Sequence, residues 1–109
     1  MMISELCKNL ELKPVYEHYS DHEASGAYTS DLLSDVMAHA GEGEILITIQ
    51  AHKNTVAVAS LVGSSAIIIC NSRPIPDDMT QSAKDEGIPI FVTGDNQYTV
   101  SGKLYKLFN

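Results

Sequence analysis

The sequence is poor in positive charge and has no segment long enough to cross a membrane. Its 109 residues include 7 lysine and arginine residues against 14 aspartate and glutamate residues, a formal net charge of −7. Such a chain repels phosphate backbones and anionic lipid headgroups, so neither nucleic acid nor a membrane is expected as a partner. No apolar run approaches the roughly 18 residues of a membrane span, and no signal-peptide pattern opens the chain. We therefore expect a cytoplasmic protein.

Cysteine is also scarce. Cys7 and Cys70 are the only two cysteines, and both stand among apolar neighbours. Neither belongs to a Cys-x-x-Cys pair, the spacing that redox sites and structural zinc sites use. Two buried thiols in a reducing compartment fit this pattern better than a disulfide.

Three motifs that identify common classes of enzyme are missing. There is no Gly-x-x-x-x-Gly-Lys-Ser/Thr loop, so the phosphate cradle that a kinase needs is absent. No Gly-x-Gly-x-x-Gly motif follows an apolar segment, which argues against a dinucleotide-binding fold. No Gly-x-Ser-x-Gly elbow presents a nucleophilic serine. We expect no catalytic activity, no cofactor and no metal.

Residues 44–93 carry the clearest structural signal. Segments 44–50, 66–70 and 88–93 have the almost unbroken hydrophobicity of strands that are buried on both faces. The segments between them are long enough for crossover helices, which are typical of a parallel sheet. The length suits one domain. We predict a single α/β domain over residues 1–109, with three layers, a mostly parallel sheet of about four or five strands, and helices on both faces.

Helices are predicted for most of the remaining chain. The apolar stripe of residues 32–40 is the strongest helix signal, with Ser30 as its expected N-cap and Gly41 as its expected left-handed end. Valine favours strands by propensity, but the segment 52–63 must cross between parallel strands, so we assign it to a helix that Gly63 ends. Further helices are predicted for residues 3–10, for residues 76–87 and from residue 94 onward.

The segment from residue 13 to residue 29 is harder to assign. Pro14 is expected to close the first helix, which should then dock on the edge of the sheet. Two weaker strand-like pieces follow, at 15–19 and 24–29. His18 and His22, with their acidic neighbours, would form a metal cluster only on a helix, so a solvated loop is the preferred interpretation.

Three runs of sequence resemble the DRTGG domain family. They are YTSDLLSDVM at residues 28–37, ITIQAHKN at 47–54 and GIPI at 87–90. The family occurs as an accessory module of bacterial HPr kinase/phosphorylases, of some phosphotransacetylases and of some CBS-domain pyrophosphatases, and also as small free-standing proteins. The resemblance covers nearly the whole chain, which looks like a free-standing member.

The residues that give the family its name are replaced in this sequence. In the family, Asp-Arg follows one core strand and Thr-Gly-Gly follows the next. The corresponding positions hold His52-Lys53 and Cys70-Asn71-Ser72. The resemblance implies a non-catalytic regulatory or ligand-sensing module, a metabolic enzyme or signalling protein as its partner, and self-association.

Polar residues gather where the predicted core strands end. Ligands of open parallel sheets bind outside the carboxyl ends of the strands. Lys53 and Arg73 could there pair with a small anionic or nucleotide-like ligand, and helix N-termini would supply further donors. The alternative is that these turns are polar because they are solvated and capped. The candidate ligand-binding residues are Gln50, His52, Lys53, Asn54, Asn71, Ser72, Arg73, Thr93 and Asp95.

A second candidate site lies at the start of the 32–40 helix. The side chains of Thr29, Ser30 and Asp31 could hold a ligand or accept a phosphate, which would suit the positive end of the helix dipole. The alternative is a helix cap together with an acid that matches the dipole.

An enzyme remains the alternative function. It would act on a phosphorylated or acyl substrate through His52, with Cys70 or Asp95 as its partner. The competing interpretation of Cys70 is a buried structural thiol.

Self-association is suggested by residues 55–62, which leave almost no polar side on a helix. Such a helix must be covered on more than one face, either by the N-terminal segment or by a second copy. We predict a two-fold homodimer that buries this helix or its neighbour.

Overall fold

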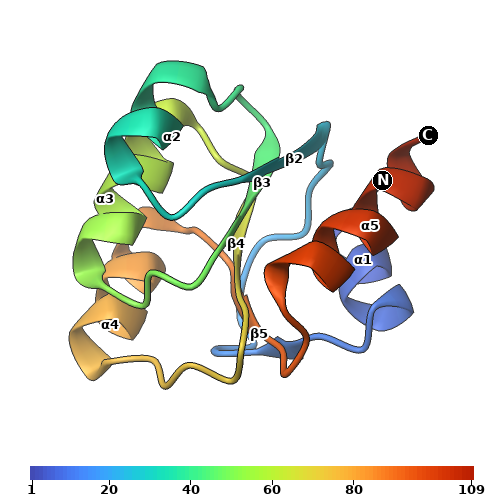
Figure 1. Ribbon diagram of the computed structural model, residues 1–109. Helices are drawn as coiled ribbons and strands as arrows, with labels where there is room; N and C mark the ends of the chain where they lie inside the picture. The colour runs from blue at the N-terminus through green and yellow to red at the C-terminus, as the bar shows by residue number, and fades with distance from the viewer.

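Five strands form one sheet in the computed structural model, which describes residues 1–109 (Figure 1). All neighbouring strands are parallel except β1 and β5, so the predicted fold class is confirmed. The three predicted core strands are parallel neighbours and form the centre of the sheet. In sheet order the strands are β1 (Lys13–Pro14), β5 (Ile90–Val92), β4 (Ala66–Ile69), β3 (Glu44–Thr48) and β2 (Gly26–Thr29).

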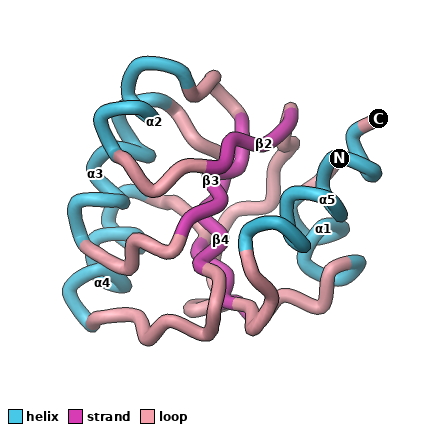
Figure 2. Tube along the Cα trace, viewed as in Figure 1, coloured by secondary structure: helices cyan, strands magenta, loops and turns pink.

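Helices cover both faces of this sheet (Figure 2). One layer holds α2 (Leu33–His39), α3 (Lys53–Val62) and α4 (Asp77–Glu86), and the other holds α1 (Ile3–Asn9) and α5 (Gln97–Phe108). No helix has both the length and the hydrophobicity needed to cross a bilayer.

The central strands are apolar at nearly every position because both of their faces are buried. Side chains alternate along a strand, so Ile67 and Ile69 of β4 pack against the α2–α4 layer. Ile68, between them, packs against the α1–α5 layer. The two layers bury β4 completely and β3 and β5 for most of their length, which explains the hydrophobic runs of these strands.

Two of the predicted helix ends are confirmed. Gly63 and Gly87 terminate α3 and α4 with φ angles of 76° and 69°, the left-handed conformation that glycine adopts without strain. The prediction for Gly41 is wrong. The helix α2 stops at Ala40, which is extended, and the left-handed glycine of this connection is Gly43, with φ of 83°.

The first helix and Pro14 differ from the prediction. The helix α1 ends at Asn9 and lies on a face of the sheet beside α5, not on its edge (Figure 1). Pro14 does not end the helix but belongs to β1, where Lys13 pairs with Val92 in antiparallel register. A strand of two residues has no periodicity that a sequence could display.

The strand-like piece at 15–19 is not a strand, whereas the piece at 24–29 contains β2. Side-chain anchors hold residues 15–19 in place. The hydroxyl of Tyr16 donates to the carbonyl oxygen of Ile88 at 2.7 Å. The ring of Tyr19 meets that of Phe91 edge-on, with 5.5 Å between centroids. These aromatic residues account for the strand-like composition of the segment.

Candidate ligand-binding site

The loops that leave the carboxyl ends of β3, β4 and β5 lie together at one end of the sheet, because these strands are parallel neighbours. The loop after β4 runs between two hollows at this end of the sheet. The hollows have volumes of about 570 Å³ and about 400 Å³, and Arg73 and Pro74 border both of them. The candidate residues of the sequence therefore do not form one cluster.

The larger hollow, which we call the arginine pocket, lies between β1, the end of β5 and the loop after β4. Arg73 is the single arginine of the chain, and Lys13 of β1 supplies a second positive charge. Neither side chain takes part in an ion pair, since the two ion pairs of the structure join the N-terminus to Glu23 and Lys103 to Asp95. The pocket is lined by Glu11, Lys13, Pro14, Val15, Ser72, Arg73, Pro74, Ile75, Val92, Thr93 and Gly94.

A tight turn fixes the backbone of Arg73. Asn71 and Ser72 have φ angles of 61° and 51°, and the amide of Arg73 donates to the carbonyl oxygen of Cys70 at 3.4 Å. Two successive left-handed residues define a type I′ turn, which normally favours glycine and asparagine.

The turn is also tied to the loop after β5. The amide of Asn71 donates to the carbonyl oxygen of Asp95 at 3.0 Å, and the amide of Ser72 donates to that of Thr93 at 2.9 Å. Gly94 lies against Ser72, where an added Cβ would come within 3.3 Å of the hydroxyl oxygen. Ser72, Arg73 and Thr93 of the sequence-based site are thus held at one wall of the arginine pocket.

The smaller hollow lies between the loops after β3 and β4. Gln50 and His52 line it together with Arg73. The backbone oxygen of Gln50 accepts from the buried hydroxyl of Thr55 at 2.7 Å, which fixes the start of α3. The imidazole of His52 is exposed and makes no hydrogen bond within the chain.

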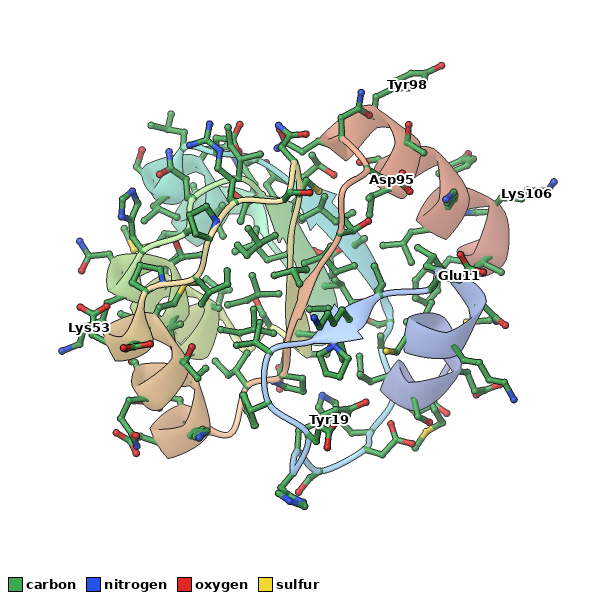
Figure 3. All side chains as sticks on the ribbon, turned by 90° about the horizontal axis from the view of Figure 1, so that it is seen from below. Glu11, Tyr19, Lys53, Asp95, Tyr98 and Lys106 are labelled. Carbon is green, nitrogen blue, oxygen red and sulfur yellow. The ribbon has the colours of Figure 1, made fainter.

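Lys53 and Asp95 lie apart from both hollows. Lys53 borders a separate acidic surface with Asp77, Asp78 and Asp85 of α4. Asp95 pairs with Lys103 at 2.9 Å. Figure 3 shows Lys53 and Asp95 on opposite sides of the molecule. The exposed Asn54 follows Lys53 on α3, so these residues do not join Arg73 in one site.

The residues before α2 hold the fold together. The Oδ1 atom of Asp31 accepts hydrogen bonds from the Thr48 hydroxyl at 2.9 Å, from the Ile49 amide at 3.0 Å and from the Gln97 side chain at 2.9 Å. It therefore joins the end of β3 to the start of α5. This explains the acid at that position without any ligand.

The two hydroxyls beside Asp31 also have partners within the chain. The Thr29 hydroxyl lies 2.7 Å from that of Ser101 on α5. Ser30 Oγ accepts from the Leu32 amide at 3.2 Å, which forms a local turn. The prediction that Ser30 is the N-cap of α2 is wrong, because Leu32 occupies that position.

The catalytic pair of the alternative enzyme is not assembled. Cys70 is fully buried, and burial, followed by the nearby carboxylates of Asp31 and Asp95, raises the pKa of its thiol to about 11. A thiol of this pKa is protonated at neutral pH and is a poor nucleophile. Asp95 is engaged by Lys103, and no hydrogen bond links His52 to either residue.

No three histidine, cysteine or acidic side chains lie together as metal ligands would. The ring of His22 instead connects two segments of backbone. Its Nδ1 lies 2.8 Å from the Ser20 oxygen and its Nε2 lies 2.7 Å from the Ser65 oxygen.

Comparison with known proteins supports the fold. No family model and no curated protein sequence matches the chain. Among solved structures, one that contains the CBS and DRTGG domains of the regulatory region of Clostridium perfringens pyrophosphatase is similar, with a TM-score of 0.69 at 13% sequence identity. That structure is complexed with its activator, diadenosine tetraphosphate. The match covers 94% of this chain and 44% of that one, so this chain spans less than half of that structure. The chain has a DRTGG-like fold, as the sequence resemblance indicated.

Proposed function

We propose that the protein is a non-catalytic regulatory module that senses a small anionic ligand in the arginine pocket. The observation that carries this proposal is the placement of Arg73 and Lys13. In a chain with a net charge of −7, the single arginine and a lysine line one pocket, and neither is in an ion pair, although Glu11 lines the same pocket. The pocket lies at the carboxyl ends of the parallel strands, the usual ligand position in such folds.

A phosphate-bearing, nucleotide-like molecule is the ligand class that we propose. A guanidinium binds phosphate through two parallel hydrogen bonds, and a lysine adds a mobile positive charge. The volume of about 570 Å³ is within the range of small-molecule sites, about 300–1,000 Å³. The similar pyrophosphatase region was solved with a dinucleoside polyphosphate activator, which is consistent with this class.

A regulatory role agrees better with the site than catalysis does. The arginine pocket holds binding groups but no histidine, cysteine or serine–base pair that could transfer a group. The remaining nucleophile candidate, Cys70, is buried. We propose that ligand binding is read by a partner, a metabolic enzyme or signalling protein, because the chain itself shows no means of turning binding into chemistry.

A thermal-shift screen tests the ligand proposal. AMP, ADP, ATP and diadenosine tetraphosphate are added to the purified chain, and a ligand at 100 times its dissociation constant should stabilise it by about 2.7 kcal/mol. Arg73→Gln should lose the shift. Lys106→Gln removes the same charge from an exposed position on α5 and should keep it. The proposal fails if no nucleotide stabilises the protein, or if Arg73→Gln responds as the unaltered chain does.

We also propose that the module works as a homodimer. The sequence pointed to residues 55–62, and the chain itself buries one side of this helix. Thr55, Val56 and Ala59 are fully buried, while Leu61 is 73% exposed. The apolar character of α3 is thus largely explained by its place between α2, α4 and the sheet.

A further inference from the structure

The two edges of the sheet differ in how they are protected. β1 closes one edge with only two residues, Lys13 and Pro14, and proline has no N–H to offer another strand. β2 forms the other edge with Gly-Ala-Tyr-Thr, which has neither charge nor proline. It pairs with β3 alone. β2 is therefore the edge at which another strand can add.

The backbone of β2 offers specific groups for such pairing. The amide of Ser30 donates to the Ile47 oxygen at 3.2 Å and continues the ladder with β3. Backbone groups of successive residues in a strand point to opposite sides, so Tyr28 also turns its N–H and C=O toward β3. Ala27 and Thr29 consequently direct theirs to the open side.

The helix α5, which packs against β2, carries two exposed tyrosines. Tyr98 is 88% exposed and Tyr105 is 72% exposed, and a spacing of seven residues places them on one side of the helix. The bond between Ser101 and Thr29 holds α5 over β2. Tyr105 lines a hollow of about 390 Å³ with Gly26 and Ala27 of β2. Figure 3 shows Tyr98 directed away from the body of the molecule.

We propose that a second copy of the chain docks on this surface, formed by Gly26–Thr29, Tyr98 and Tyr105, which we call the β2–α5 surface. The two β2 strands pair antiparallel around a two-fold axis at Tyr28. Ala27 of each copy then lies opposite Thr29 of the other, and the two residues exchange both backbone hydrogen bonds. The two sheets become one continuous sheet. This inference gives the proposed homodimer its interface and rests on that proposal, while ligand binding in the arginine pocket does not depend on it.

Charge complementarity favours a second copy as the occupant. α5 runs antiparallel to β2: Gln97 at its start bonds Asp31 beyond the end of β2, and Phe108 in its last turn lies by Gly26 at the start of β2. A two-fold axis brings the positive N-terminal end of one α5 toward the negative C-terminal end of the other. Glu44, which lines the same hollow, then approaches the positive end of the second helix.

The exposed apolar area also fits this interface. Each tyrosine can bury about 200 Å², so Tyr98 and Tyr105 of two copies contribute about 600 Å² after their exposed fractions are taken into account. A specific interface needs about 1,000 Å² in total, and the paired strands can supply the remainder. On the opposite layer, Leu61 of α3 is 73% exposed, and Leu32 and Met37 of the neighbouring α2 region are 64% and 49% exposed.

Light scattering on matched variants tests the interface. At micromolar concentration the chain should have twice its monomer mass of 11.8 kDa. Tyr105→Glu should reduce the mass to that of the monomer with an unchanged circular dichroism spectrum, because the side chain is mostly exposed. Leu61→Glu, the control at an equally exposed position on α3, should remain dimeric. A monomeric unaltered chain overturns the proposal, and so does a dimer that only Leu61→Glu dissociates.

Amide hydrogen exchange tests the strand pairing itself. In the dimer the amides of Ala27 and Thr29 should be protected, and in Tyr105→Glu they should exchange rapidly because no strand covers them. The amide of Tyr28, which faces β3, should remain protected in both proteins. Rapid exchange of Ala27 and Thr29 in a dimeric sample would overturn the pairing. The Tyr105→Glu variant should also be titrated with diadenosine tetraphosphate. Binding by this variant would show that the ligand proposal stands even where the dimer proposal fails.

Discussion

At the scale of single residues, a hydrogen bond between Tyr28 and Asp35 links β2 to α2. The Tyr28 hydroxyl donates to Asp35 Oδ2 at 2.7 Å. This bond, followed by one from Ser30, holds the pKa of the Asp35 carboxyl below its usual value. A carboxyl whose pKa is lowered on folding adds stability above its unfolded pKa, about 3.9, and loses it as the pH falls through the folded pKa.

The pH dependence of a Tyr28→Phe variant follows from this bond. The variant should be less stable than the unaltered chain at pH 7, and the difference should shrink as the pH falls below about 4. Urea unfolding at pH 7 and at pH 3 measures it. Tyr16→Phe is the control, because the Tyr16 hydroxyl donates to uncharged carbonyl groups and its loss should cost the same at both pH values. An equal loss for Tyr28→Phe at both pH values would contradict the assignment.

The thiol of Cys70 provides a second test at this scale. Because the side chain is fully buried and its pKa is raised to about 11, it should not react with an aromatic disulfide reagent at pH 8 while the chain is folded. Cys7→Ser leaves Cys70 as the only thiol, so labelling should appear only after unfolding. Rapid labelling of the folded variant would restore Cys70 as a nucleophile and the enzyme as the alternative function.

At the scale of helices and strands, the elements with many buried residues could be predicted from the sequence. The core strands show unbroken apolar runs because helices cover both faces, and α3 was predicted by its position between two strands despite its valines. β1 was missed because two residues carry no pattern. Because β1 was not predicted, Lys13 was not among the candidate ligand-binding residues. Arg73 was among them, since it lies in the loop after β4.

The separation of Lys53 from Arg73 could not be predicted either. Both follow parallel strands, but Lys53 is already on α3 and its side chain lies beside the acids of α4. The sequence shows which loops lie at the same end of the sheet, but it does not show the direction of each side chain. The left-handed Asn71 could have been anticipated, since asparagine tolerates this conformation, but Ser72 gives no such signal.

Two glycines of the helices test the role of backbone conformation. An added Cβ would meet no atom within 4 Å at either Gly102 in α5 or Gly87 after α4. Gly102 is within a helix, so Gly102→Ala should stabilise by about 0.5–1 kcal/mol. Gly87 has φ of 69°, so Gly87→Ala should destabilise by about 1 kcal/mol.

Thermal unfolding of both glycine variants in the monomeric Tyr105→Glu background measures these effects without a contribution from self-association. Each kcal/mol should move the midpoint by about 4–8 °C in a domain of this size. A shift of the same sign for the two variants would show that space, and not backbone conformation, decides the outcome.

At the scale of the whole molecule, the two proposed surfaces lie beside opposite edge strands of the sheet. The arginine pocket adjoins β1 and β5, while the β2–α5 surface is at the other edge. Pairing through β2 therefore leaves both arginine pockets of a dimer open to solvent. The dimer should bind one ligand per chain, and dissociation into monomers should leave the affinity of each pocket unchanged.

Isothermal titration calorimetry with diadenosine tetraphosphate tests the central claim, that Arg73 and Lys13 form an anion-binding site. The unaltered chain and Lys106→Gln should bind with equal affinity. Arg73→Gln should bind at least about ten times more weakly, because a hydrogen bond to a charged group contributes about 1.5–3 kcal/mol. Equal affinity for Arg73→Gln and the unaltered chain, or no binding by the unaltered chain, would contradict the claim.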